Sequence, residues 1–146
     1  MLNEKRRYYL ENDAKFKFPK FYTLSLDEAS KHEAHIKSIF GFDESSNALD
    51  VQRKVMKASN LVRGVQADNH EFNFLDLLKS QNIEPQSELF IDWHQFNKID
   101  RISVKAFSDF FDDIWYPNSD DIYLYDDSYR WFILVMHHGA ILVCKK

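Results

Sequence analysis

The last quarter of the chain contains three short strand-forming segments separated by turn signals. The segments run from about Ile122 to Tyr125, from Arg130 to Met136 and from Ala140 to Cys144. Asp126–Ser128 favours a turn because Asp and Ser side chains bond their own backbone, and Gly139 supplies the positive φ of a tight hairpin. These segments predict an antiparallel sheet. The middle one is apolar on both faces, so we expect it to be central and covered on both sides.

The first 24 residues predict a helix followed by an extended arm. Segment 1–15 is charged and helix-forming, and its apolar contacts would come from Tyr8, Tyr9 and Leu10. Segment 16–24 is rich in aromatic residues but is broken by Pro19, which cannot donate a ladder hydrogen bond. We therefore expect an edge strand or a packing arm there.

Three further helices are predicted before residue 88. Ser25 and Glu28 have the spacing of a capping box, which opens a helix from Leu26 to Phe40 that ends at Gly41. Asn47 opens a second helix, whose apolar stripe extends to Val62 before Gly64 closes it. A third and shorter helix spans about Glu71 to Ser80, behind Asn69, and would bury Phe72, Leu75 and Leu78.

The remaining segment combines a strand and a helix. Leu89–Trp93 predicts a strand, and Ser103 opens a helix that Pro117 ends. Its inward face would carry Val104, Phe107, Phe111 and Ile114. The predicted fold class is α+β, with one domain over residues 1–146. In this domain, residues 1–88 are mainly helical and residues 89–146 form the strand–helix–three-strand part.

Composition excludes several classes of enzyme. Glycine occurs only at positions 41, 64 and 139, so a P-loop, a G-x-G-x-x-G loop and a G-x-S-x-G elbow are all impossible. We therefore expect a non-enzymatic protein without a cofactor. The formal net charge of −4 and the lack of a basic run argue against a nucleic-acid partner. The single cysteine, Cys144, and a charged N-terminus without an apolar core predict a cytoplasmic protein that does not enter a membrane.

Three aspartate pairs lie among aromatic residues in the C-terminal third. Interface centres favour Trp and Tyr, and carboxylates around them speed the encounter with a basic partner. Three interpretations stay open for the pairs: turns and solvated faces, a partner surface, or a metal site. Asp112 and Asp113 would lie at a helix end whose dipole disfavours anions, which points to an external use. The predicted partner-binding residues are Asp112, Asp113, Trp115, Tyr116, Asp120, Asp121, Tyr123, Tyr125, Asp126 and Asp127.

Histidines and the cysteine give weaker signals. His137 and His138 would point to opposite faces if they lay on a strand, which disfavours a shared metal. His32 and His35 are three residues apart on a predicted helix, with Glu28 one turn before His32, but the H-E-x-x-H arrangement is missing. We expect a buried and inert thiol at Cys144. No metal site is therefore predicted.

The segment from about residue 90 to residue 143 resembles small bacterial immunity proteins of contact-dependent growth inhibition and related polymorphic toxin systems. The residues that carry the resemblance are Trp93, Phe96, Ile99, Asp100, Phe111 to Pro117, Ser119 to Asp121, Trp131, His138 and Gly139. The resemblance implies a cytoplasmic inhibitor that neutralises one cognate toxin without catalysing a reaction. Nuclease toxins have basic clefts, so an acidic inhibitor would suit such a target.

Two alternative functions remain. The first is a metal-dependent hydrolase that uses Asp120, Asp121 and His138. The second is an oligomeric scaffold or regulator in which the C-terminal strand pairs between subunits and Lys145 and Lys146 protect its edge.

Overall fold

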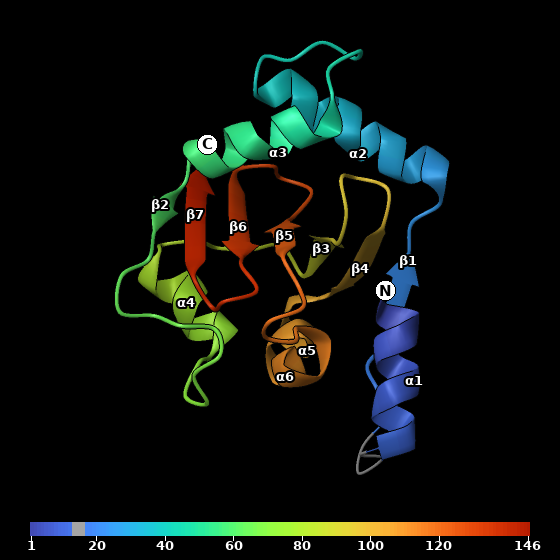
Figure 1. Ribbon diagram of the computed structural model, residues 1–146, viewed down its shortest axis with the longest axis vertical. Coiled ribbons are helices and arrows are strands. Elements are labelled where there is room, and N and C mark those ends of the chain that lie inside the picture. Colours follow the sequence, from blue (N-terminus) through green and yellow to red (C-terminus); the bar gives the residue numbers. More distant parts are fainter. Residues whose placement is uncertain (13–16) are drawn as a thin grey trace.

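An antiparallel sheet of seven strands runs through the middle of the protein (Figure 1). The computed structural model describes residues 1–12 and 17–146. Its strands are β1 (Phe21–Thr23), β2 (Asn60–Leu61), β3 (Glu88–Asp92), β4 (Ile99–Ser103), β5 (Ile122–Tyr125), β6 (Trp131–Val135) and β7 (Ile141–Lys145), in the spatial order β1-β4-β3-β5-β6-β7-β2. The α+β fold class is confirmed, as are the four predicted strands that correspond to β3, β5, β6 and β7.

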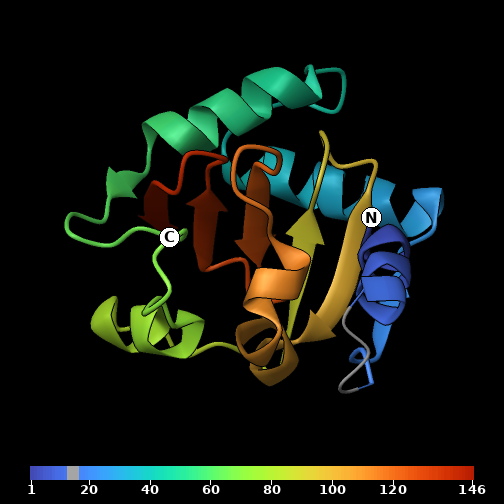
Figure 2. The same cartoon turned by 60° about the horizontal axis from the view of Figure 1, so that its bottom comes forward.

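Helices cover both faces of this sheet. They are α1 (Leu2–Asn12), α2 (Leu26–Ile39), α3 (Ala48–Lys57), α4 (Phe74–Ser80), α5 (Val104–Asp109) and α6 (Phe111–Ile114). Helices α2 and α3 lie on one side of the sheet and α4, α5 and α6 on the other (Figures 1 and 2). The longest described helix, α2, has 14 residues, and the described chain offers no apolar helical segment of the length that a bilayer requires.

Two hydrophobic cores result, because side chains alternate between the faces of each strand. Leu89, Ile91, Ile122, Leu124 and Ile133 belong to the core under α1, α4, α5 and α6. Phe90, Tyr125, Phe132, Leu134 and Cys144 belong to the core under α2 and α3. All five residues of β6 are buried, which confirms that this strand is central and covered on both sides.

The two edge strands come from the N-terminal half of the chain. β1 pairs with β4, with Tyr22 opposite Arg101, and it confirms the predicted edge strand. Phe16, where that prediction began, lies outside the described residues. β2 pairs with β7, with Leu61 opposite Leu142. β7 is therefore not an edge strand, and the premise of the scaffold alternative is wrong because β2 already occupies that edge.

The helix boundaries confirm some signals and correct others. The capping box of Ser25 and Glu28 is present at the start of α2, and Asn47 caps α3. However, α3 ends at Lys57 and does not continue to Val62, because the next residues pair with β7 as β2. β4 was not predicted at all. The last predicted helix is interrupted at Phe110 and forms α5 and α6.

Three corrections concern which side chains face inward. In α1 the buried residues are Leu2, Lys5 and Tyr9, whereas Tyr8 and Leu10 are exposed. Residues 13–15 of that predicted helix lie outside the described part. α4 starts at Phe74 and not at Glu71, since Asn73 is its cap, and it buries Phe74, Leu77 and Leu78, while Phe72 and Leu75 are only half-buried.

The break at Phe110 also determines where the first aspartate pair lies. Asp112 and Asp113 lie in the first turn of α6. Because α6 is a single turn that directly follows the end of α5, the two aspartates lie at a helix end as predicted, and the effect of the helix dipole on them stays a prediction.

Candidate functional site

The structure separates the predicted partner-binding residues. The α6 region, with Asp112, Asp113 and Tyr116, lies on the face of the sheet that α1 and α6 cover. Tyr123 and Tyr125 belong to the opposite core, under α2 and α3. Four of the predicted residues are buried and unavailable to a partner, which corrects the prediction for them: Trp115, Asp120, Tyr125 and Asp126. Tyr123 is half-buried and Asp127 is exposed.

Asp120 is buried because it satisfies three groups from the chain. Its Oδ2 lies 2.6 Å from Lys5 Nζ and accepts a 2.8 Å hydrogen bond from the Tyr116 backbone N–H. Its backbone carbonyl accepts from Trp115 Nε1 at 2.8 Å. Burial lowers the pKa of Lys5, and the hydrogen bond and charge of Asp120 oppose that shift.

Asp126 plays a similar internal role in the turn between β5 and β6. Its Oδ2 accepts from Trp131 Nε1 and from the Gln86 backbone N–H, both at 2.9 Å. Its Oδ1 accepts from the Ser128 backbone N–H at 2.9 Å, which confirms the predicted turn chemistry. The first residues of the second and third aspartate pairs are therefore structural.

Of the remaining members, Asp127 lies near His32 on the α2 face, whereas Asp113 lies near Tyr116. Tyr8 of α1 meets Tyr116 edge to face, with ring centroids 6.0 Å apart. Tyr8 is 58% exposed and Tyr116 is half-buried. The Lys5 ammonium lies 3.4 Å from the Tyr116 ring centroid, on the same lysine that pairs with Asp120. We call Tyr8, Asp112, Asp113, Tyr116 and Asp121 the tyrosine rim.

Charge around the tyrosine rim is mixed, because its three aspartates are acidic but the exposed Arg6 and Arg7 directly precede Tyr8 on α1. On α1, Glu4 and Glu11 are one turn before and after Tyr8, and both are exposed. Burial raises the pKa of the Tyr116 hydroxyl, and the nearby Asp113 charge adds to this shift. The phenol therefore stays neutral and able to donate a hydrogen bond.

Asp121 connects the rim to the hairpin between β6 and β7. Its Oδ1 accepts from the His137 backbone N–H at 2.6 Å and lies 2.9 Å from His137 Nδ1. The Asn118 backbone N–H donates to the His137 carbonyl at 2.6 Å. His137 and His138 lie in a turn with their rings 5.3 Å apart, so the expectation that they point to opposite faces of a strand is wrong.

A second polar cluster lies under α2, on the opposite face of the sheet. His32 Nδ1 lies 2.9 Å from the Tyr129 hydroxyl and 3.3 Å from the Tyr125 hydroxyl, while His35 stacks on Tyr129. Burial lowers the pKa of His32 and thus favours its neutral ring. The contacts with Tyr129 therefore explain why His32 and His35 are three residues apart, as packing partners of one ring.

Asp92, at the end of β3, is another buried carboxylate, and it lies on the α2 and α3 face of the sheet. It accepts from Gln52 Nε2 at 2.7 Å and from the backbone N–H groups of His94 and Phe96, both at 3.1 Å. Burial raises the pKa of Asp92 to about 7, although these donors oppose the shift. Asp92 therefore changes charge near neutral pH without contact with solvent.

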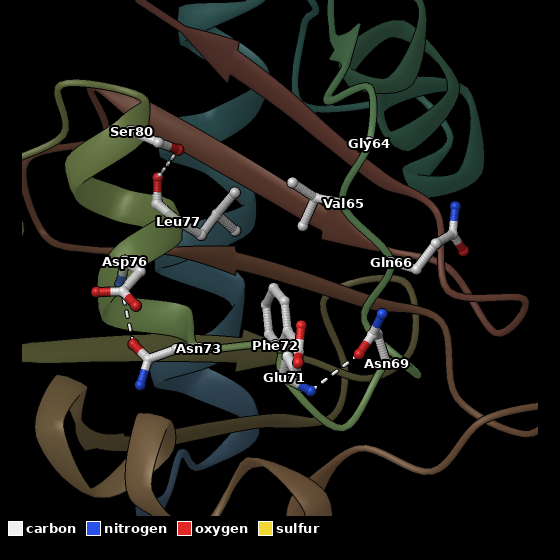
Figure 3. A pocket seen from close by; sticks show the side chains of 10 residues that line it. All are labelled: Gly64, Val65, Gln66, Asn69, Glu71, Phe72, Asn73, Asp76, Leu77 and Ser80. Carbon is white, nitrogen blue, oxygen red and sulfur yellow. Dashed lines mark hydrogen bonds between the residues drawn. The ribbon is translucent and has the colours of Figure 1, made fainter.

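A pocket of about 320 Å³ lies between α4 and segment 64–69. Figure 3 shows Val65, Phe72 and Leu77 between these two walls. The Ser80 hydroxyl donates to the Leu77 carbonyl, and the Asn69 and Asn73 side chains accept from nearby backbone N–H groups. None of the residues that line this pocket was predicted as a site. The polar groups of Ser80, Asn69 and Asn73 are already hydrogen-bonded to nearby backbone groups.

In the described part of the chain, no three His, Cys, Asp or Glu side chains lie together as a cation site. Asp120 is held by Lys5, and Asp121 faces His137. Cys144 is buried as expected, and burial raises the pKa of its thiol.

Comparison with family models, with curated proteins and with solved structures finds no match to this chain.

Two residues of the site were missed from the sequence. The sequence predicts no role for Lys5, and it predicts Tyr8 to be an apolar contact of the first helix. The spacing of Leu2, Lys5 and Tyr9 (i, i+3, i+7) would have placed the lysine on the inward face and Tyr8 outside it.

Proposed function

We propose that the chain is a non-enzymatic binding protein of the immunity type, which neutralises a cognate toxin through the tyrosine rim. The observation that carries the proposal is the Tyr8–Tyr116 pair, an exposed aromatic contact held by a buried lysine. Exposed tyrosines that lose little freedom on binding are the residues from which interface hot spots are built.

The aspartates of the tyrosine rim favour a basic partner, although Arg6 and Arg7 are exposed before Tyr8. Asp112 and Asp121 are exposed, Asp113 is half-buried, and Glu4 and Glu11 flank Tyr8 on α1. Carboxylates around an aromatic centre increase the association rate with a positively charged surface and reject acidic competitors. A nuclease toxin has such a surface, because its cleft must attract phosphate.

The side chains of the tyrosine rim are held in place by internal contacts, which supports a role in binding. Asp120 fixes the backbone of Tyr116, Lys5 fixes its ring, and His137 holds Asp121. A surface whose side chains are already positioned before binding needs less ordering when the partner arrives. The internal aspartates thus contribute to binding indirectly, by holding the rim.

The test uses the purified toxin domain encoded by the gene immediately upstream of this chain's gene. Asp112→Lys with Asp121→Lys should reduce the association rate about tenfold or more at low salt. The control, Asp27→Lys with Asp50→Lys, makes the same change in net charge at exposed sites on α2 and α3. Equal association rates for both double variants would argue against the rim, and an upstream gene that encodes no toxin would argue against the immunity function.

A further inference from the structure

A groove of about 960 Å³ collects basic side chains that are distant in the sequence. Lys79 comes from the end of α4, Arg130 precedes β6, and Lys145 and Lys146 lie at the end of β7. Glu84 is the single carboxylate among the lining residues. In a chain of net charge −4, this concentration of cations stands out against the general charge.

These cations are not neutralised by the protein. Within residues 1–12 and 17–146, none of the four forms an ion pair with a carboxylate. Only Lys146 has another strong contact, with its ammonium 4.3 Å from the Phe40 ring centroid. Because Phe40 belongs to the core under α2 and α3, the Lys146 ammonium is directed away from the groove, and the other three cations remain. Their mutual repulsion is unfavourable, and a bound anion would relieve it.

Neutral hydrogen-bond donors accompany the cations. Asn82 and Gln86 line the same groove, and neither side chain has a hydrogen-bond partner among the described residues. Asn82 has a φ of +55°, which turns the chain after α4 and shapes the groove wall. Ammonium, guanidinium and amide groups together are the donors that bind phosphate oxygens.

The groove lacks a platform for a nucleobase. Trp131 lines it but is buried, and its Nε1 is engaged by Asp126. Proteins that bind single-stranded nucleic acid place exposed aromatic rings on which the bases stack. We infer that this groove binds a small, multiply phosphorylated anion and recognises its phosphate groups alone.

Isothermal titration calorimetry with inorganic tripolyphosphate tests this inference. We expect saturable binding to the unaltered chain and a loss of at least about tenfold in affinity for Lys79→Gln with Lys145→Gln. The matched control is Lys20→Gln with Lys98→Gln, two exposed lysines outside the groove, and it should bind as the unaltered chain does. All four substitutions are on exposed side chains, and unfolding midpoints will verify that each variant is folded.

Two kinds of result would overturn the inference. One is an equal loss of affinity in both double variants, or no saturable binding to the unaltered chain. The other is tighter binding of a single-stranded oligonucleotide or of a polyglutamate peptide than of tripolyphosphate at the same salt concentration, which would assign the groove to a macromolecule. Toxin binding by the tyrosine rim is independent of this outcome, because the groove and the rim share no residues.

Discussion

Lys5 Nζ lies 2.6 Å from Asp120 Oδ2, although the two residues are 115 positions apart and both side chains are buried. This ion pair joins the first helix to the loop that precedes β5, and it also positions the Tyr116 ring. Stability and the proposed binding surface therefore depend on the same contact.

Asp120→Ala should lower the free energy of unfolding by about 3–5 kcal/mol, because it leaves a buried ammonium without its partner. Adding Lys5→Met should recover much of that loss. Urea denaturation measures both values. The control, Asp109→Ala, breaks an exposed pair with Lys105 and should cost about 0.5 kcal/mol or less. Equal losses for Asp120→Ala and Asp109→Ala would contradict a buried pair.

Asp92 should make stability decrease as the pH rises. Its folded-state pKa of about 7 exceeds the ordinary value of 3.8, so the folded protein binds the proton more tightly than the unfolded chain. The contribution is therefore complete below pH 3.8 and is lost progressively up to about pH 7. Asp92→Asn should remove this slope. Denaturation at several pH values measures it, and identical slopes for both proteins would show that folding does not raise the pKa of Asp92.

His32 should act in the opposite direction. Burial lowers its pKa below the ordinary value of 6.5, so the folded state favours the neutral ring. Stability from this group is present above pH 6.5 and decreases as the pH falls through the lowered pKa. An NMR titration of the imidazole should give a midpoint below 6.5. A midpoint above 6.5 would contradict the burial of His32, because the Asp127 charge would then outweigh the effect of burial on its pKa.

Gly139 is needed where the β6–β7 turn meets segment 64–69. An added Cβ would lie 2.6 Å from Asp68 Oδ1 and 2.8 Å from Gln66 Oε1, and the residue has a φ of +94°. We expect Gly139→Ala to cost about 2–3 kcal/mol, from backbone strain and from displacement of the exposed Asp68 and Gln66 side chains. Gly64→Ala is the matched control, since its φ is +77° with nothing within 4 Å, and it should cost about 1–2 kcal/mol. The reverse order in thermal unfolding would contradict the close contact.

Local signals were sufficient for the elements that depend on local physics. The capping box at Ser25, the cap at Asn47 and the turns at Asp126 and Gly139 are present because the signal that defines each lies in neighbouring residues. β4 was missed for the opposite reason. Its central residues, Asp100 and Arg101, are charged, and Asp100 is buried by hydrogen bonds from Leu2, Thr23 and Trp93 in other elements. No local pattern indicates such partners.

In the candidate site, too, exposure could be predicted where it depends on local sequence and could not where it depends on tertiary contacts. Sequence reasoning placed Tyr116, Asp112 and Asp121 on a surface, and they are at least partly exposed. It treated both residues of each aspartate pair alike, whereas Asp120 and Asp126 turn inward to meet tryptophan side chains and backbone N–H groups. Which carboxylate of a pair is buried depends on the tertiary position of its donors, and two adjacent aspartates carry no information about that.

Replacement of Tyr8 tests the central claim most directly, because Tyr8 is exposed and its removal leaves the buried Lys5–Asp120 pair intact. Calorimetry with the proposed cognate toxin domain should show that Tyr8→Ala weakens binding by about tenfold or more. Tyr22→Ala, which removes another exposed tyrosine at the β1 edge, should leave the affinity within about twofold. Equal affinities for the unaltered chain and Tyr8→Ala would contradict the proposal that the tyrosine rim is the binding surface.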